Sequence, residues 1–137
     1  MTLGVTMLLA DHAQVANGKL FISGGGWSIV DAPTPPFHIA LLLLVPWDRA
    51  GVPLDLTLTL IDEDGRVVRQ GGDGSEVRVQ GQLAVDRPPA HLVGVPLDVP
   101  MVIGIPSLNI AGATRYTWIL EVEGQTSDDW RLSFSTR

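Results

Sequence analysis

Apolar and polar residues alternate one by one along much of this chain, and this alternation restricts the possible folds more than any other feature. In residues 54–60, four leucines alternate with Asp55, Thr57 and Thr59. Because successive side chains of an extended strand point to opposite sides, the pattern predicts a strand with one buried face. No long segment repeats its apolar residues at the helical period of about 3.6 residues, so we expect an all-β chain. The alternation recurs at residues 5–9, 77–85, 97–105, 116–122 and 130–134.

Turn-forming residues separate these strands along the whole chain. Asn17-Gly18 and Asp64-Gly65 are typical of tight turns, and residues 123–129 are expected to be the loop of a closing hairpin. Gly81 is expected to mark a bulge or a close approach of two backbones. About eight strands with one buried face each favour two stacked antiparallel sheets, a β-sandwich of immunoglobulin-like, C2-like or jelly-roll type. A closed barrel is the alternative.

The prolines also carry information about the arrangement of the strands. Pro100 and Pro106 favour an edge strand for residues 97–105, because proline cannot donate a backbone hydrogen bond to a neighbouring strand. The irregular segment 86–96 predicts a crossover between the sheets with a helical turn near residues 89–92. The sequence shows no linker and no internal repeat, so we expect a single domain over residues 1–137.

Composition excludes several kinds of chemistry. The chain has no cysteine, so a disulfide, a thiolate metal site and a cysteine nucleophile are all impossible. Its net charge of −6 and its scattered basic residues are unsuited to nucleic-acid backbones, so no nucleic-acid partner is expected. Apolar residues make up 45% of the chain and charged residues 18%, which favours a packed globular protein over disorder.

The N-terminal segment MTLGVTMLLADHA contains a short apolar stretch, but no positive charge precedes it, so we do not expect a secretion signal. The longest other apolar run, residues 39–45, is far shorter than the roughly 20 residues that a membrane-spanning helix needs. We therefore expect a cytoplasmic protein with no membrane partner.

One predicted strand, residues 37–45, breaks the alternation because both of its sides are apolar. Phe37, Ile39, Leu41, Leu43 and Val45 supply one side, and Ala40, Leu42 and Leu44 supply the other. Burial on two sides is the usual reason for such a strand. Either another segment of the same chain covers the second side, or a second subunit or another protein does. Ala40, Leu42 and Leu44 are therefore the candidate interface residues.

The stretch ADHAQVANGKLFISGGGWSIV, residues 10–30, poses a separate question. Its glycines lack both phosphate-binding patterns, and the residues after them favour a strand, so no helix N-terminus is available to hold a phosphate. We expect a kinked or bulged strand that lets Trp27 fold over the core. Asp11 and Gln14 are expected to be turn or cap residues where the first strand ends. The candidate structural corner consists of Asp11, His12, Gly24, Gly25, Gly26 and Trp27.

Metal and cofactor sites are not expected. His12, His38 and His91 have no metal-binding spacing, and Asp62 to Gly65 are typical of a hairpin turn. Calcium remains possible if the aspartate-rich loops fall at one end of the molecule, as they do in C2-like domains. The aspartates in question are Asp62, Asp64, Asp73, Asp128 and Asp129.

Enzymatic activity is not expected either. Asp11 and His12 are adjacent in the sequence, so in a strand they point to opposite sides and cannot act as orienter and base. A small hydrolase that uses His12 with Asp11 or Asp48 is the enzyme alternative. Trp27 and Trp47 are the candidates for a sugar-stacking surface, because the other two tryptophans alternate in step with core residues.

The segments VTMLLADHAQVANGKLFISGGGWSIV, FHIALLLLVPW, PLDVP and YTWILEVEG resemble a family of small proteins of unknown function from high-GC Gram-positive bacteria. The resemblance runs from Val5 to about Phe134. It implies a compact β-sandwich and transfers no activity to any residue. It also implies that the candidate corner residues form one structural corner. In this corner the Asp11 carboxylate or the His12 imidazole would make hydrogen bonds to backbone groups that the glycine bulge leaves unpaired.

These observations favour a non-catalytic protein that acts through protein contacts, as a homo-oligomer or as an accessory subunit. The alternatives are a module that binds a small ligand, either a carbohydrate or calcium, and the small hydrolase described above. A small-molecule partner is favoured less than a protein partner.

Overall fold

The strands form where the sequence alternates. The computed structural model describes residues 3–137, so Met1 and Thr2 of the expected domain lie outside the described residues. In β5 (Leu54–Ile61) all four leucines are buried, whereas Asp55 is exposed. The other strands are β1 (Gly4–Ala16), β2 (Lys19–Gly25), β3 (Ile29–Val30), β4 (Phe37–Val45), β6 (Arg69–Gln70), β7 (Ser75–Glu76), β8 (Arg78–Leu83), β9 (Leu97–Ile105), β10 (Arg115–Val122) and β11 (Arg131–Thr136).

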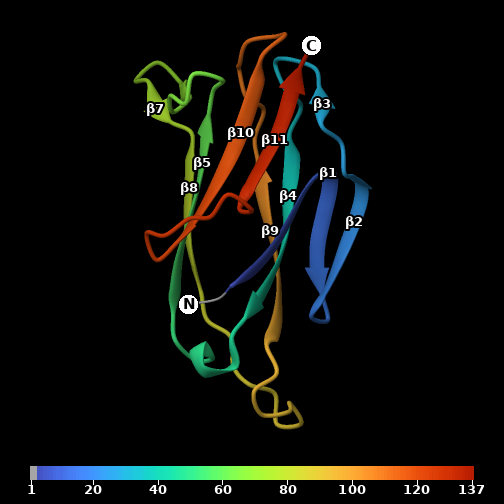
Figure 1. Ribbon diagram of the computed structural model, residues 1–137. Helices are drawn as coiled ribbons and strands as arrows, with labels where there is room; N and C mark the ends of the chain where they lie inside the picture. Colours follow the sequence, from blue (N-terminus) through green and yellow to red (C-terminus); the bar gives the residue numbers. More distant parts are fainter. Residues whose placement is uncertain (1–2) are drawn as a thin grey trace.

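The all-β class is confirmed for residues 3–137, which contain no α-helix and one short 3-10 turn, η1 (Trp47–Arg49). Two main sheets have the orders β2-β1-β4-β9 and β3-β11-β10-β5-β8, and β6 pairs with β7 (Figure 1). The described residues form eleven strands in place of about eight. Each sheet has two open edges, so the barrel alternative is wrong. The pairs are antiparallel except that β3 runs parallel to β11.

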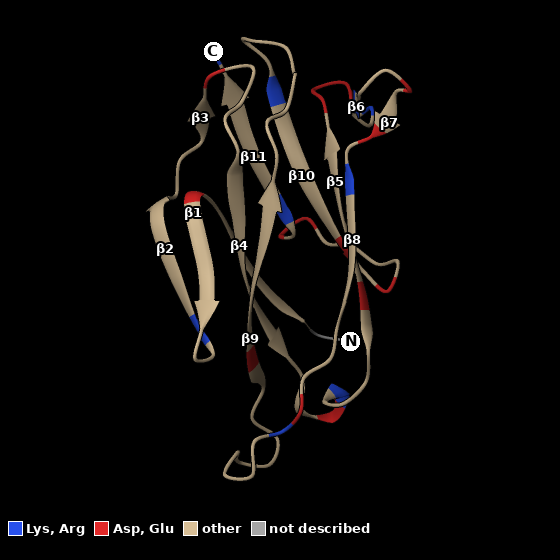
Figure 2. Cartoon of the chain, turned by 180° about the vertical axis from the view of Figure 1, so that it is seen from behind, with Lys and Arg blue, Asp and Glu red and all other residues tan. Residues whose placement is uncertain are grey.

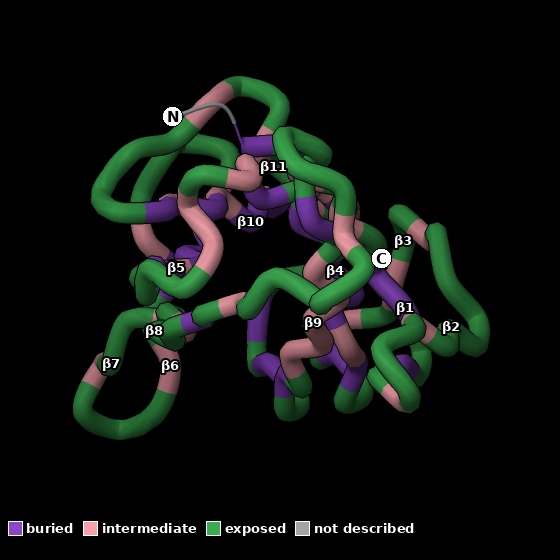
Figure 3. Tube along the Cα trace, turned by 90° about the horizontal axis from the view of Figure 1, so that it is seen from below, coloured by how far each residue is buried: buried purple, intermediate pink, exposed green. Residues whose placement is uncertain are grey.

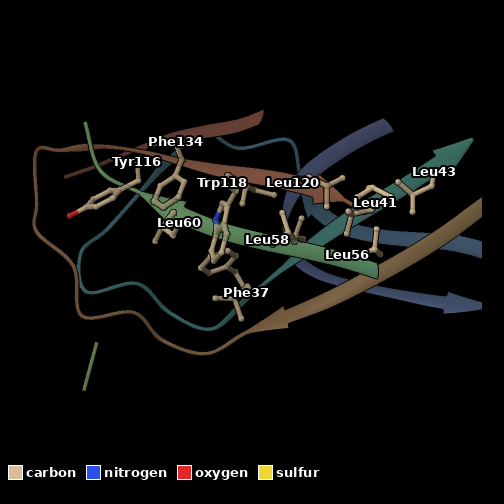
Figure 4. Close-up of a cluster of buried hydrophobic side chains, with 14 of the residues drawn as sticks. Phe37, Leu41, Leu43, Leu56, Leu58, Leu60, Tyr116, Trp118, Leu120 and Phe134 are labelled. Atoms are coloured by element: carbon tan, nitrogen blue, oxygen red, sulfur yellow. The ribbon is translucent and has the colours of Figure 1, made fainter. Parts of the chain in front are cut away.

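The two main sheets share one buried hydrophobic cluster. Viewed from below, β11, β10, β5 and β8 lie on one side and β9, β4, β1 and β2 on the other (Figure 3). Leu41 and Leu43 of β4 join Leu58 of β5 and Trp118 of β10 in this cluster (Figure 4). Phe37 and Phe134 are also almost fully buried in it. Core residues therefore come from both sheets.

β9 is an edge strand, as the prolines predict, and it is the last strand of its sheet. The closing hairpin is confirmed, because β10 pairs with β11. The segment between β8 and β9 does cross from one sheet to the other, but the expected helical turn within it is wrong. That segment contains only isolated turns, with His91 N–H donating to Pro88 O at 2.9 Å.

Gly81 is neither a bulge nor a point of close approach. Its neighbours in β8 pair with β5 in an unbroken register, with Leu56 opposite Gly81. A Cβ atom at Gly81 would meet no atom within 4 Å. Instead, Gly81 lines an apolar cavity of about 100 Å³ whose walls include Leu41 and Met101 of the other sheet and Leu120 of β10. The missing side chain leaves space between the sheets.

β1 takes part in two different pairings. Its first half, from Gly4 to Ala10, pairs with β4, and its second half, from Ala10 to Ala16, pairs with β2. The chain bends sharply where the two halves meet, so the hairpin of β1 and β2 leaves the sheet direction (Figure 1). Asn17 and Gly18 close this hairpin with positive φ values of 52° and 68°, as expected for the Asn-Gly turn.

Candidate functional site

The hairpin of β1 and β2 covers part of the second apolar side of β4. Ala40, on that side, is 2% exposed and belongs to a small cluster with Ala10 and Ala13. Leu20 of β2 and Val102 of β9 pack against the same cluster. The interpretation that the same chain covers the strand is therefore correct for Ala40.

The cover ends before the lower half of β4. Leu42 is 39% exposed and Leu44 is 42% exposed, so for these two residues cover by the same chain is wrong. Leu8 of β1, which pairs with Ala40, is 38% exposed beside them. Leu42 lies between Thr6 and Pro100 in the sheet. We call the surface of Thr6, Leu8, Leu42, Leu44 and Pro100 the outer face.

The outer face contains no charged residue. β4 and the half of β1 that pairs with it have no Lys, Arg, Asp or Glu. β4 is tan throughout in Figure 2, whereas β1 has a red segment beyond the half that pairs with β4. One charge borders the outer face: Asp98 of β9 pairs with Leu44, so its exposed side chain points to the same side of the sheet. β4 is hydrogen-bonded to a strand on each side. Its backbone is therefore not available to a further strand, and only side chains can make contacts.

The corner begins at Gly24, which lies opposite Asp11 between the pairs Ala10–Gly25 and His12–Ser23. Gly24 has φ +61°, and a Cβ atom there would lie 2.8 Å from Cγ of Asp11. Both facts require glycine, because other residues are strained at this φ and there is no room for a side chain. The strand is kinked without an extra residue, since the register is the same on both sides of Gly24.

The next two glycines complete the turn away from β1. A Cβ atom on Gly25 would lie 2.5 Å from Ile22 Cγ2. Gly26 has φ +86°, and its N–H donates to Leu9 O at 2.7 Å. After Gly26 the chain continues through two residues without regular structure into β3. A helix N-terminus, which a phosphate cradle would need, does not follow these glycines.

The polar residues of the corner do not act as expected. β1 runs through Asp11 and Gln14 to Ala16, so the interpretation of both as turn or cap residues is wrong. Within residues 3–137, the Asp11 carboxylate and the His12 ring make no hydrogen bond to the backbone. His38 of β4 takes this place, with Nδ1 3.4 Å from Asp11 O and its ring centroid 4.9 Å from that of His12.

Trp27 folds over the core, as predicted. Its ring lies edge-on to Phe37 at 5.5 Å and to Phe134 at 6.4 Å, measured between ring centroids. Its Nε1 is buried and has no hydrogen-bond partner among the described residues. Trp47 is also engaged, because the Arg87 guanidinium lies 3.6 Å from the centre of its ring. Trp27 is therefore engaged in the core, and Arg87 covers one face of the Trp47 ring.

The structure does not bring together the residues of the hydrolase alternative. The described hydrogen bonds include none between Asp11 and His12. His12 contacts His38 near the start of β4, whereas Asp48 follows the end of that strand. At about 3.3 Å per residue, β4 separates the two groups by more than 20 Å.

The aspartates do not form a calcium site either. Asp62 Oδ1 accepts hydrogen bonds from the N–H groups of Asp64 and Arg66, both at 2.9 Å, which confirms the turn. The loop with Asp128 and Asp129 follows β10, which is antiparallel to β5, so that loop lies at the opposite end of β5 from Asp62. Within residues 3–137, no three His, Asp or Glu side chains come together as a metal site.

Asp73 belongs to a separate surface turn. Its Oδ1 accepts hydrogen bonds from Ser75 Oγ at 2.7 Å and from Ser75 N at 3.1 Å. These two bonds, the hydroxyl first, hold the pKa of Asp73 below its ordinary value. The Asp73 carboxylate therefore stabilises its own turn through its hydrogen bonds with Ser75.

Residues 3–137 contain no helix that is long and apolar enough to cross a membrane.

Comparison with known proteins places the chain in a family without assigning it a role. The model of a family of unknown function (DUF6941) matches residues 5–135. No curated protein matches. No solved structure matches. Because the family model covers nearly the whole sequence, the chain belongs to this family of unknown function, DUF6941.

Proposed function

We propose that this chain is a non-catalytic β-sandwich protein that binds a second copy of itself through the outer face. The shared core between the two main sheets supports the sandwich arrangement. The exposure of Leu42 and Leu44 on a central strand is the observation that carries the self-association. Central strands of a sheet with one solvated side normally alternate apolar and polar residues, and β4 does not.

The residue types of the outer face favour a second copy as the partner. A contact with two-fold symmetry brings the same surface of both copies together, so charges on it would meet their own kind. None of the five residues of the outer face is charged, and leucine against leucine is compatible with itself. Asp98, beside Leu44, would lie at the margin of the contact. Since β4 is paired on both sides, the copies would meet face to face rather than by joining strand edges.

The size of the effect follows from the exposed fractions. Burying a whole leucine side chain contributes about 1.5–3 kcal/mol, and about two fifths of Leu42 and Leu44 remain to be buried. Two leucines in each of two copies would therefore contribute about 2–5 kcal/mol to association. This is a substantial share of the roughly 8 kcal/mol that a micromolar dimer requires, and the rest would come from neighbouring contacts.

Sedimentation velocity over a range of protein concentrations tests the proposal. We expect the wild type to sediment as a dimer or larger oligomer, and Leu42→Glu and Leu44→Glu to shift it to the monomer. Leu92→Glu is the matched control, because Leu92 is 74% exposed in the crossover segment and lies outside the outer face. Because Leu42 and Leu44 are already partly exposed, we expect both variants to stay folded, with an unchanged circular dichroism spectrum. A monomeric wild type at high micromolar concentration would refute the proposal.

A further inference from the structure

We propose that a cavity at the end of the molecule near η1 binds a small carboxylate with an apolar body. The cavity has a volume of about 860 Å³, within the range usual for small-molecule sites. The chain turns out of β4 there, and the start of β1 and the end of the crossover segment complete the walls. The apolar part of the lining comes from Leu3, Leu44, Pro46, Trp47 and Pro96.

Arg49 supplies the positive charge of this cavity. It lines the cavity and is only partly exposed, and its Nε is buried. Within residues 3–137, its side chain makes no hydrogen bond and no ion pair. A buried guanidinium N–H without an acceptor is unfavourable, so an acceptor supplied from outside the chain would be bound there. Among the described residues, the side chains of Arg66 and Arg131 also lack acceptors, but both are exposed to water.

Trp47 is held in place as a wall of the cavity. The Arg87 guanidinium stacks on its ring and also donates to Trp47 O from Nε at 3.0 Å and from a terminal nitrogen at 2.8 Å. These bonds fix η1 before any ligand arrives, and a pre-organised site loses less entropy on binding. Arg87 adds a second positive charge near the site.

The unpaired guanidinium of Arg49 favours an anion. Asp48 also lines the cavity, but it is exposed and makes no ion pair with Arg49. Asp98 of β9, which pairs with Leu44 of the lining, adds a second negative charge nearby, so the case for an anion depends on the unpaired guanidinium of Arg49. A single guanidinium matches a carboxylate, whose two oxygens accept from its parallel N–H groups. The apolar walls then suit an alkyl or aryl body rather than a polyol or a phosphate ester.

Isothermal titration with three probes of equal chain length tests this inference. We expect octanoate to bind one site per chain, and octan-1-ol and octylamine to bind at least about tenfold more weakly because neither pairs with a guanidinium. The Trp47 fluorescence should change on octanoate binding, and this change should be absent in Trp47→Phe. No saturable binding of octanoate, or equal binding of octan-1-ol, would overturn the inference.

Variants of Arg49 assign the charge recognition. Arg49→Gln should weaken octanoate binding at least about tenfold while leaving octan-1-ol binding unchanged, and Arg49→Lys should weaken it less. Arg66→Gln is the control, because Arg66 is exposed and remote from the cavity. Equal octanoate affinity of Arg49→Gln and the wild type would refute the role of Arg49. A thermal unfolding curve for each variant separates loss of binding from loss of the fold.

The cavity shares Leu44 with the outer face, so Leu42 is the residue that separates carboxylate binding from self-association. Leu42 does not line the cavity, so Leu42→Glu should bind octanoate as the wild type does, even where that variant is monomeric. Binding by a monomeric wild type would refute the proposed oligomer and leave the carboxylate site standing. Self-association without octanoate binding would refute the carboxylate site and leave the proposed oligomer standing.

Discussion

Gly81 allows a sharp test of the packing between the two main sheets. It lies in β8 opposite Leu56 and lines the apolar cavity of about 100 Å³ between the sheets. A Cβ atom there meets no atom within 4 Å, and its φ is outside the left-handed region. Gly81→Ala therefore adds a methyl group without strain, and we expect the variant to be more stable than the wild type.

The expected gain has two parts. Replacing glycine by alanine at a compatible φ contributes about 0.4–1 kcal/mol, because the unfolded chain loses conformational freedom. Full burial of one methyl group contributes up to about 0.8 kcal/mol, and β8 is an edge strand, so burial is partial. We expect a total near 1 kcal/mol, which for a chain of this length raises the melting temperature by roughly 3–5 °C.

Urea unfolding followed by tryptophan fluorescence measures this difference. Gly18→Ala is the matched control, since its Cβ would also meet nothing within 4 Å but its φ is +68°. The left-handed conformation should make Gly18→Ala less stable by about 1 kcal/mol. A Gly81→Ala protein that is less stable than the wild type, or no difference between the two variants, would refute this account of the cavity.

Two further predictions concern the corner and the surface turn. Gly24→Ala should lower the free energy of unfolding by about 2 kcal/mol or more, because the new methyl group meets Asp11 and φ +61° is strained. In a double-mutant cycle measured by urea unfolding, Asp11→Ala should recover part of this loss. Fully additive effects of the two substitutions would contradict the contact between residues 11 and 24. Ser75→Ala should raise the pKa of Asp73 toward its ordinary value in an NMR titration, and an unchanged pKa would contradict the hydrogen bonds. Because the folded pKa is lowered, the contribution of Asp73 to stability is present above its unfolded pKa and is lost as the pH falls through the folded value.

Much of the strand arrangement follows from local pattern. The leucines of β5 repeat at a period of two, so that strand could be placed from the sequence alone. Pro100 predicts that β9 is an edge strand, and Asn17-Gly18 predicts the first hairpin. In each of these three cases, the residues that determine the local structure lie close together in the sequence.

The errors arise where distant segments decide the outcome. Gly81 suggests a bulge in isolation, but only the positions of Leu41 and Met101 across the cavity reveal that it leaves an empty space. Asp11 suggests the end of a strand, yet β1 continues because β2 pairs with its second half. Turn-forming residues alone do not show which strand a segment will pair with.

The sequence predicts the residues of the candidate site but not which of them are exposed. The two-sided apolarity of β4 identifies Ala40, Leu42 and Leu44 together. It does not show that the β1–β2 hairpin reaches Ala40 and leaves the other two exposed, because the bend in β1 is set by pairing along its whole length. His38 was missed as a corner residue, although its place two residues before Ala40 puts it on the same side of β4.

Cross-linking from single cysteines tests the outer face as an interface most directly, because the chain has no cysteine of its own. We expect Leu42→Cys, treated with a short bismaleimide, to give a covalent dimer. Glu121→Cys, on the outer side of the other sheet, should remain monomeric at the same protein concentration. Equal cross-linking of the two variants, or none from Leu42→Cys, would contradict self-association through this face.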